Sequence, residues 1–312
     1  MHLQLSFYAM RLNLHNETNP LKAVILGTAL NNGAPPQLSE AYDPKSRQHI
    51  MNGTYPEEAA MVREIKSVKR ILEEHGVKVY QPENIAGCNQ IFTRDIGFVI
   101  EDKFIIANIL PEREKEVQAL APILADIHPS KVVRMPEDHH IEGGDVMLAD
   151  DHIFIGTYRG NDYPDLITAR TNQKAINAIK DKFPNKKIKS FNLRKSNDDP
   201  FENALHLDCC FQPVGDDYAI IHKNGFLDEN EYQWLIDHYG RSNVFEISKQ
   251  EMYDMSSNIF SISPEVVISD KHFERLNEWL EKRKIKVEKV NYREIAKQEG
   301  LLRCSTLPLI RN

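Results

Sequence analysis

The sequence has few cysteines and lacks several patterns that define whole classes of protein. Only four cysteines occur in 312 residues, which does not suggest a disulfide framework. No run of about 18 apolar residues is present, so we expect no membrane span. The N-terminus lacks a basic start and a convincing cleavage site, so we expect it to be part of the mature fold. A reducing cytoplasm fits these features best.

The charged residues form no long basic block. Lysine and arginine number 39 against 46 acidic residues, and the net charge is −7, which argues against a nucleic-acid partner. The cysteines and histidines lack close zinc-ligand spacing, and no phosphate-binding glycine loop occurs. We therefore expect no metal and no cofactor, and homo-oligomerisation stays open.

One hairpin pattern recurs along the chain. Apolar, β-branched or aromatic runs are paired across short polar turns, which predicts antiparallel strands. These predicted hairpins cover residues 97–107, 145–156, 209–222 and 258–269. A fifth would pair residues 22–27 with 304–310 and so join the two ends of the chain.

Helical patterns lie between the hairpins, and most are followed by a further strand. The predicted helices cover residues 56–74, 111–127, 164–183, 228–239 and 270–283. The predicted third strands cover residues 77–80, 131–134, 188–191, 244–247 and 285–290. A strand–strand–helix–strand unit repeated in this way predicts a quasi-cyclic α/β domain spanning residues 1–312. The alternative is a generic α/β domain with unrelated hairpins.

A polar residue stands at or just before the first strand of every predicted hairpin. These residues are Asp95, Glu142, His206, Asn258 and Cys304. If the units are related by rotation, the five side chains converge at one end of the axis. Together they provide a thiol, a histidine and carboxylates, which are the groups needed to attack a planar cationic carbon such as a guanidinium.

Four segments containing these residues resemble the signature of the guanidino-group-modifying superfamily. The segments are Phe-Thr-Arg-Asp at 92–95, Glu-Gly-Gly-Asp at 142–145, His-Leu-Asp at 206–208 and Cys-Ser-Thr-Leu-Pro-Leu-Ile-Arg at 304–311. They occur in the family's order over nearly the whole chain. The family includes arginine deiminases, dimethylarginine dimethylaminohydrolases and amidinotransferases. The resemblance implies a five-bladed α/β propeller, or pentein, built from pseudo-fivefold ββαβ repeats.

The resemblance also implies roles for individual residues. Cys304 would be the nucleophile, because a guanidinium carbon is a poor electrophile and requires a thiolate. His206 would protonate the leaving amine and then take a proton from the second nucleophile. Glu142 would orient His206 and stabilise its cation. Asp95 and Asp208 would bind the guanidinium through paired hydrogen bonds.

Three further residues are candidates for contact with the substrate. Asp145 is one, although it is also placed to hold the site backbone. Arg159 loosely resembles an arginine that binds the substrate carboxylate in arginine deiminases, and Arg113 is an alternative. The long polar loop at residues 28–55 contains several glycines and prolines. We expect it to form a lid that helps to select the substrate.

These observations predict a cysteine-dependent hydrolase acting on the guanidino carbon of arginine or a related small molecule through a covalent Cys304 adduct. The compact length, close to that of the dimethylarginine hydrolases, favours a hydrolase, of the deiminase or the dimethylaminohydrolase type. The chain has no room for the helical insertion of arginine deiminases. An amidinotransferase remains an alternative, since the motifs do not separate attack by water from attack by an amine. A non-catalytic pentein, such as the ribosome-binding translation factor with this fold, is a further alternative.

Overall fold

The strands form five separate three-stranded sheets in the computed structural model, which describes residues 10–163 and 165–312. Residues 1–9, predicted to belong to the mature fold, lie outside this range. Each sheet consists of an antiparallel pair of strands and a third strand parallel to the middle strand. The sheets confirm the predicted pseudo-fivefold α/β propeller.

Four of the sheets are built from consecutive strands. The first contains β3 (Gly97–Ile100), β4 (Lys103–Ile106) and β5 (Val132–Arg134), and the second contains β6 (Val146–Ala149), β7 (His152–Thr157) and β8 (Lys187–Asn192). The third contains β9 (Phe211–Val214), β10 (Tyr218–Ile221) and β11 (Val244–Glu246), and the fourth contains β12 (Phe260–Ser263), β13 (Val266–Asp270) and β14 (Lys286–Val290). Most of the hairpin residues are buried, which explains their nearly continuous apolar sequences.

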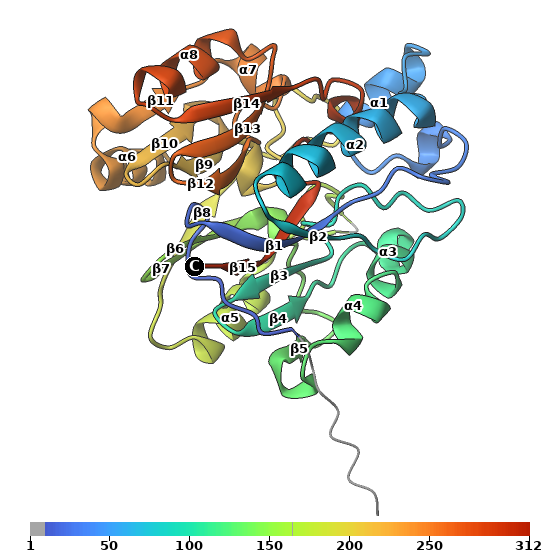
Figure 1. The fold of residues 1–312 in the computed structure, drawn as a ribbon, viewed down its shortest axis with the longest axis horizontal. Coiled ribbons are helices and arrows are strands. Elements are labelled where there is room, and N and C mark those ends of the chain that lie inside the picture. The colour runs from blue at the N-terminus through green and yellow to red at the C-terminus, as the bar shows by residue number, and fades with distance from the viewer. Residues whose placement is uncertain (1–9, 164) are drawn as a thin grey trace, which may run out of the picture.

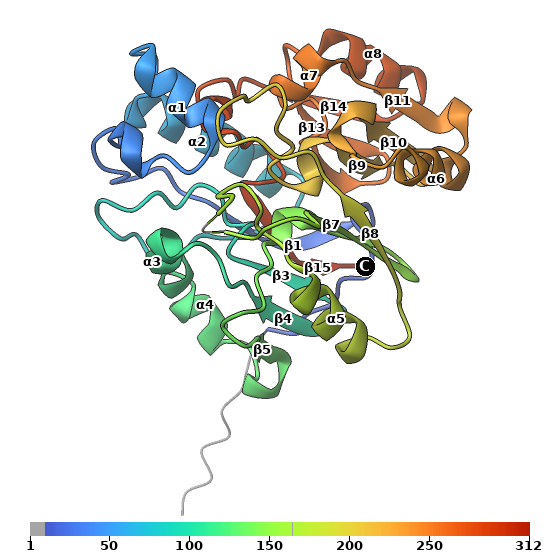
Figure 2. The same cartoon turned by 180° about the vertical axis from the view of Figure 1, so that it is seen from behind.

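The fifth sheet joins both ends of the chain. In it, β1 (Leu21–Leu26) pairs antiparallel with β15 (Thr306–Arg311) and parallel with β2 (Lys78–Tyr80). Leu26 stands opposite Thr306, so Cys304 is brought beside the end of β1. In both views of the molecule, β15 lies next to β1 near the middle (Figures 1 and 2).

The main helices connect the middle and outer strands of the sheets and lie toward the outside (Figures 1 and 2). They are α2 (Glu58–Glu74), α3 (Glu114–Gln118), α4 (Ala121–Ala125), α5 (Gln173–Lys182), α6 (Glu229–Tyr239) and α8 (Glu274–Lys282). Helix α2 shows the physical basis of the pattern, because Met61, Ile65 and Val68 are buried along one face. It ends before Gly76, whose φ of 72° is the left-handed conformation that favours glycine.

Two predicted helices are shorter in the structure. The predicted helix 111–127 is divided into a 3-10 turn (Pro111–Arg113), α3 and α4. Pro122 lies in the first turn of α4 and lacks the N–H that a continuous helix would require. Residue 164 of the predicted helix 164–183 lies outside the described residues. Within them the helix begins only at Gln173, because Asn172 caps it by accepting a hydrogen bond from Ala175 N at 3.1 Å.

The predicted polar loop 28–55 contains a helix that we did not predict. Following a 3-10 turn (Leu38–Glu40), α1 extends over Pro44–Met51. Asp43 caps α1 by accepting a hydrogen bond from Ser46 N at 2.7 Å, and Pro44 occupies the first helical position. A further short helix, α7 (Lys249–Tyr253), was also not predicted. Lys45 Nζ donates to Tyr253 O, which fixes α1 against α7.

Candidate active site

The inner strand of each sheet is β3, β6, β9, β12 or β15. The loops that precede these five strands are joined to one another in a ring. Each loop makes a hydrogen bond to the next, and the links run from Arg94 N to Cys304 O (3.0 Å), Gly143 N to Asp95 O (3.3 Å), Leu207 N to Asp145 Oδ1 (2.9 Å), Ser257 Oγ to Asp208 O (2.8 Å) and Arg303 N to Asn258 O (3.3 Å). The predicted polar residues are therefore brought together at one end of the propeller.

The glycines of the 142–145 segment permit this close approach. A Cβ on Gly143 would lie 2.2 Å from Arg94 O, and a Cβ on Gly144 would lie 2.7 Å from the His206 ring. Neither position has room for a side chain. These glycines allow the His206 ring to lie directly against the neighbouring loop.

His206 lies between two carboxylates. Its Nε2 lies 2.7 Å from Glu142 Oε2, and its Nδ1 lies 3.7 Å from Asp95 Oδ1. All three side chains are buried. Burial alone would lower the pKa of His206, but the two carboxylates outweigh it and raise that pKa above its usual value. His206 is therefore suited to begin a reaction as a proton donor.

Glu142 lies behind His206 and contacts two arginines. Arg170 Nη1 lies 3.1 Å from Glu142 Oε1, and Arg113 Nη1 lies 3.6 Å from Oε2. Burial would raise the pKa of Glu142, but Arg170 and His206 hold it well below its usual range. Glu142 is therefore ionised and able to orient the imidazole.

Cys304 is held by the side chain of Asn258. Asn258 Oδ1 accepts a hydrogen bond from Cys304 N at 3.1 Å, and Nδ2 lies 3.1 Å from Sγ. The Sγ also lies 3.6 Å from Asp208 Oδ2. Burial, followed by the charges of Asp208 and Asp95, raises the pKa of the thiol well above its usual value. The raised pKa favours the neutral thiol in the free enzyme.

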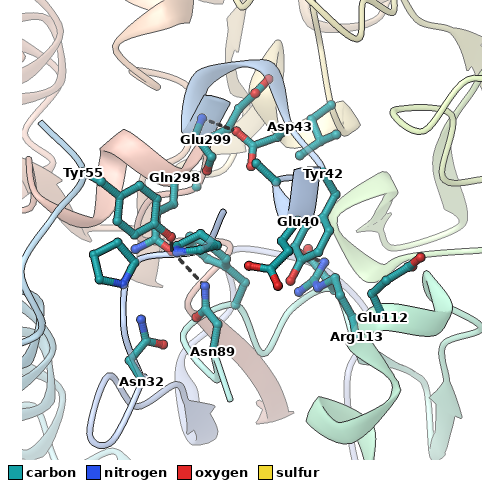
Figure 3. A pocket seen from close by; sticks show the side chains of 18 of the residues that line it. Asn32, Glu40, Tyr42, Asp43, Tyr55, Asn89, Glu112, Arg113, Gln298 and Glu299 are labelled. Carbon is teal, nitrogen blue, oxygen red and sulfur yellow. Dashed lines mark hydrogen bonds and ion pairs between the residues drawn. The ribbon is translucent and has the colours of Figure 1, made fainter. Parts of the chain in front are cut away.

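A cavity of about 630 Å³ opens onto Cys304, His206 and Asp95. Much of its wall comes from residues 32–46 of the 28–55 segment and from residues 298–300 just before Cys304. In Figure 3, Tyr55, Gln298 and Asn89 lie on one side and Arg113 lies on the other. The Gln298 Oε1 accepts hydrogen bonds from Asn89 Nδ2 at 2.7 Å and Tyr55 Oη at 3.1 Å.

The two other predicted substrate-binding aspartates lie behind this surface. Asp208 Oδ2 pairs with Arg303 Nη1 at 2.9 Å, and Asp208 is not among the residues that line the cavity. Asp145 accepts from Thr171 Oγ1 at 2.7 Å as well as from Leu207 N, and it does not line the cavity either. Of the two roles predicted for Asp145, this position favours holding the backbone of the site over contact with the substrate.

The two arginines predicted to bind a substrate carboxylate are both paired with carboxylates of the protein. Arg159 does not line the cavity, because its half-exposed guanidinium pairs with Glu231 on α6. Arg113 does line it, but its Nη1 lies 3.0 Å from Asp95 Oδ2 and its Nε lies 2.8 Å from Glu116 Oε1. Both guanidinium groups are thus already neutralised by protein carboxylates.

Three buried residues near the site were not predicted to have a role there. Glu17 lies 3.2 Å from Arg303 Nη2 and so supports the arginine that pairs with Asp208. Arg170 donates from Nη2 to Tyr42 O at 2.8 Å and thereby connects Glu142 with the 28–55 segment. Glu299 lines the cavity. In the sequence, only the closeness of Glu299 to Cys304 indicates a place at the site. Arg170 lies within the predicted helix 164–183, and nothing in its local sequence indicates a contact with Glu142.

Among the described residues, Asp95, Glu142 and His206 are the group whose ligand atoms could hold a metal ion, since these atoms lie within 4.8 Å of one another. Both carboxylates are already in contact with arginine, at the distances given above. Two nearby guanidinium charges oppose the binding of a divalent ion.

Comparisons with known proteins agree with this geometry. The family model for eukaryotic N,N-dimethylarginine dimethylhydrolases matches residues 37–311. The chain belongs to this family. It is also 30% identical over 244 residues to the uncharacterized protein YkgA of Bacillus subtilis (strain 168), covering 77% of each chain. Membership places the chain in the pentein superfamily of guanidino-modifying enzymes.

Solved structures of the superfamily share the fold. The amidinotransferase SxtG from Microseira wollei matches with a TM-score of 0.75 at 18% identity, covering 96% of this chain and 97% of SxtG. The N-terminal domain of the cyanobacterial arginine dihydrolase ArgZ matches with a TM-score of 0.75 at 17% identity, covering 93% and 98%. The inosamine-phosphate amidinotransferase StrB1 from Streptomyces griseus matches with a TM-score of 0.74 at 15% identity, covering 96% of this chain and 97% of StrB1.

In the described part of the chain, no helix is both long and apolar enough to span a membrane.

Proposed function

We propose that this protein is a cysteine-dependent hydrolase that cleaves a C–N bond at the guanidino carbon of a small molecule. The observation that supports the proposal most strongly is the shared cavity of Cys304, His206 and Asp95, with Glu142 hydrogen-bonded behind His206. A binding module has no evident use for a buried thiol, an acid–base histidine and a carboxylate oxygen without a hydrogen-bond donor at one position. The non-catalytic alternative therefore has less support.

Asp95 would bind the guanidinium. Its Oδ2 is occupied by Arg113, but Oδ1 has no hydrogen-bond partner among the described residues. A buried acceptor without a donor is unfavourable until a ligand supplies one. The positive charge of the substrate would also stabilise a thiolate on Cys304, which burial and two carboxylates oppose in the free enzyme.

The reaction would proceed in two steps. In the first, the bound cation favours loss of the Cys304 thiol proton to solvent, the thiolate Sγ bonds to the guanidino carbon, and the C–N bond breaks as the leaving amine takes a proton from His206. In the second, water bonds to the resulting S-linked amidino carbon and gives one proton to His206. The C–S bond then breaks, and the second water proton returns to the Cys304 sulfur. The products are an amine or ammonia and a ureido compound, and His206 returns to its original charge.

An amidinotransferase differs in the second nucleophile and in which C–N bond breaks. The fold shared with SxtG and StrB1 supports this second candidate. In that case, the amine that carries the alkyl chain of the substrate would leave first, and an acceptor amine would then attack in place of water. We also propose a reducing compartment such as the cytoplasm, since the four cysteines are free.

The test is turnover of a panel of arginine, methylated arginines, agmatine and guanidino acids, with and without an acceptor amine. Formation of a ureido product without an acceptor supports the hydrolase. Formation of the amidino derivative of the acceptor amine, only when that acceptor is present, supports the transferase. Absence of turnover for every compound, with Cys304 unmodified, would contradict both.

A further inference from the structure

His206 is held through its backbone as well as through its ring. The ring contacts Glu142 and Asp95, at the distances given above. The backbone of residues 204–207 is held by two side chains of opposite charge, Lys195 and Asp145, which belong to different segments. Neither side chain lines the cavity, so neither is placed to contact the reacting atoms.

Lys195 holds the two carbonyl groups that come directly before His206. Its Nζ donates to Leu205 O at 2.7 Å and to Ala204 O at 2.9 Å. Ala204 and Leu205 are both buried, so their carbonyl groups require a donor from the protein. Two consecutive carbonyl groups that face one point need a donor with several hydrogens, and an ammonium group has three.

Asp145 holds the backbone on the other side of His206. Its Oδ1 accepts a hydrogen bond from Leu207 N at 2.9 Å, and its Oδ2 accepts one from Thr171 Oγ1 at 2.7 Å. Asp145 belongs to the same short segment as Glu142, which contacts the imidazole. This segment therefore fixes the ring of His206 and the peptide that follows it, whereas Lys195 fixes the two peptides that precede it.

The charges of Lys195 and Asp145 support each other. Burial raises the pKa of Asp145, and the positive charge of Lys195 is the largest influence that opposes this rise. Burial lowers the pKa of Lys195, and the negative charge of Asp145 is the largest influence that opposes this fall. The ionised form of each side chain is thus favoured by the presence of the other.

Lys195 is itself placed by the loop that joins β8 to the His206 segment. Ala204 N donates to Arg194 O at 2.9 Å, and Ser196 N donates to Asn203 Oδ1 at 3.1 Å. These hydrogen bonds close the loop on both sides of Lys195. The lysine is half-buried, and its backbone is fixed next to the carbonyl groups that it holds.

We propose that Lys195 is a positioning residue for the proposed reaction, and that it holds the backbone before His206 so that the imidazole keeps the orientation needed for proton transfer. The inference rests on the proposed function, because it concerns the same histidine. Without Lys195, two buried carbonyl groups lose their donor, and the segment is expected to rotate them toward other donors or water. This rotation would move the imidazole away from Glu142 and leave Cys304 and Asp95 in place.

The first experiment is kinetic and uses whichever of arginine and the methylated arginines the wild-type enzyme converts fastest. Lys195→Met keeps an apolar stem of similar length but removes the donors. We expect kcat to fall by at least about tenfold and KM to change less, because each lost hydrogen bond involves a charged group. Lys195→Arg provides a cation with several donors and is expected to recover part of the loss.

Lys174→Met is the matched control. It makes the same substitution at an exposed lysine on α5 that pairs with Asp138 at the surface. Both kinetic parameters should stay within about twofold of the wild-type values, because exposed ion pairs contribute little.

The second experiment does not depend on activity. In a crystal structure of Lys195→Met, the backbone of residues 204–206 is expected to be displaced. The His206 Nε2 should lie more than about 3.5 Å from Glu142 Oε2, beyond hydrogen-bond distance, instead of 2.7 Å. If Lys195→Met does not fold, Lys195→Gln, which keeps one donor group, is measured in the same two experiments and is expected to show the same changes to a smaller extent.

A third experiment tests whether Lys195 acts through His206. In a His206→Ala background, adding Lys195→Met should change the rate of adduct formation on Cys304 by less than about twofold, because the residue that Lys195 positions is already gone. A further loss as large as that in the wild-type background would show a general effect on the fold and would overturn the inference.

The outcomes separate this inference from the proposed function. A wild-type kcat in Lys195→Met, or an unmoved His206 in its crystal structure, would overturn the inference alone. Failure of the wild-type enzyme to convert any guanidino compound of the panel, with Cys304 unmodified, would overturn the proposed function and this inference with it.

Discussion

Asn258 contacts both the backbone and the side chain of Cys304: Asn258 Oδ1 accepts a hydrogen bond from Cys304 N at 3.1 Å, and Asn258 Nδ2 lies 3.1 Å from Cys304 Sγ. Both residues precede the inner strand of their own sheet, and the pseudo-fivefold arrangement brings them together. A side-chain N–H directed at sulfur favours the thiolate. Asn258 is therefore expected to support the nucleophile without reacting itself.

Replacing Asn258 tests this support. Asn258→Asp keeps the acceptor for Cys304 N but replaces the donor to Sγ with a negative oxygen. We expect kcat/KM to fall by at least about tenfold, because a hydrogen bond to a charged group contributes about 1.5–3 kcal/mol. Steady-state kinetics measures the effect, with Asn258→Ala as the comparison. Wild-type activity in the aspartate variant would exclude a donor role for Asn258.

The nucleophile itself is tested by Cys304→Ser. We expect turnover to fall by several orders of magnitude while the fold is retained, because removing one member of a catalytic unit disables the unit. Cys88→Ser is the control, since Cys88 is a free cysteine that does not line the cavity, and it should retain activity. A Cys304→Ser variant with even a tenth of wild-type activity would show that another group attacks the substrate.

Substitutions of Asp95 and Glu142 are expected to change different kinetic parameters. Asp95→Asn presents donors to a guanidinium that also offers donors, so KM should rise by roughly tenfold to several hundredfold. Glu142→Gln leaves Asp95 in place but weakens the support of the His206 cation, so kcat should fall more than KM rises. Kinetics on both variants, with circular dichroism to verify folding, tests the assignment. The opposite pattern would mean that the two roles are reversed.

Cys304 should react slowly with alkylating agents in the free enzyme. Its pKa lies well above the usual value, so most of the population is neutral thiol at pH 8 and the thiolate fraction rises as the pH increases. The rate of modification by iodoacetamide should therefore still increase between pH 8 and 10, within the range where the protein stays folded. Labelling of Cys304→Ser is subtracted to remove the contribution of Cys88. A plateau reached near neutral pH would contradict a raised pKa.

Much of the fold could be predicted because its signals are local. The five hairpins show short apolar runs across polar turns, and the polar residues before their first strands reveal which loops meet at the axis. Pro122 and Asn172 are also local signals, and they divide or shorten helices that the surrounding apolar pattern predicts to be continuous. Asp43 and Pro44 are a similar case at the start of α1.

The remaining parts of the site depend on contacts between distant residues. The sequence shows that Arg113 and Arg159 are cations, but not that Asp95, Glu116 and Glu231 already neutralise them. Likewise, nothing local indicates that Asn203 and Lys45 donate to Glu299, since these contacts exist only after the ring of sheets has closed.

The most direct test of the account is the mass of the peptide containing Cys304 after acid quench during turnover. We predict a covalent adduct on that peptide and none on the peptides containing Cys88, Cys209 or Cys210. The mass also identifies the broken bond, because a hydrolase retains the substrate's alkyl chain in the adduct, whereas an amidinotransferase retains only the amidino group. An unmodified Cys304 in an enzyme that is turning over substrate, or an adduct on another cysteine, would contradict the account.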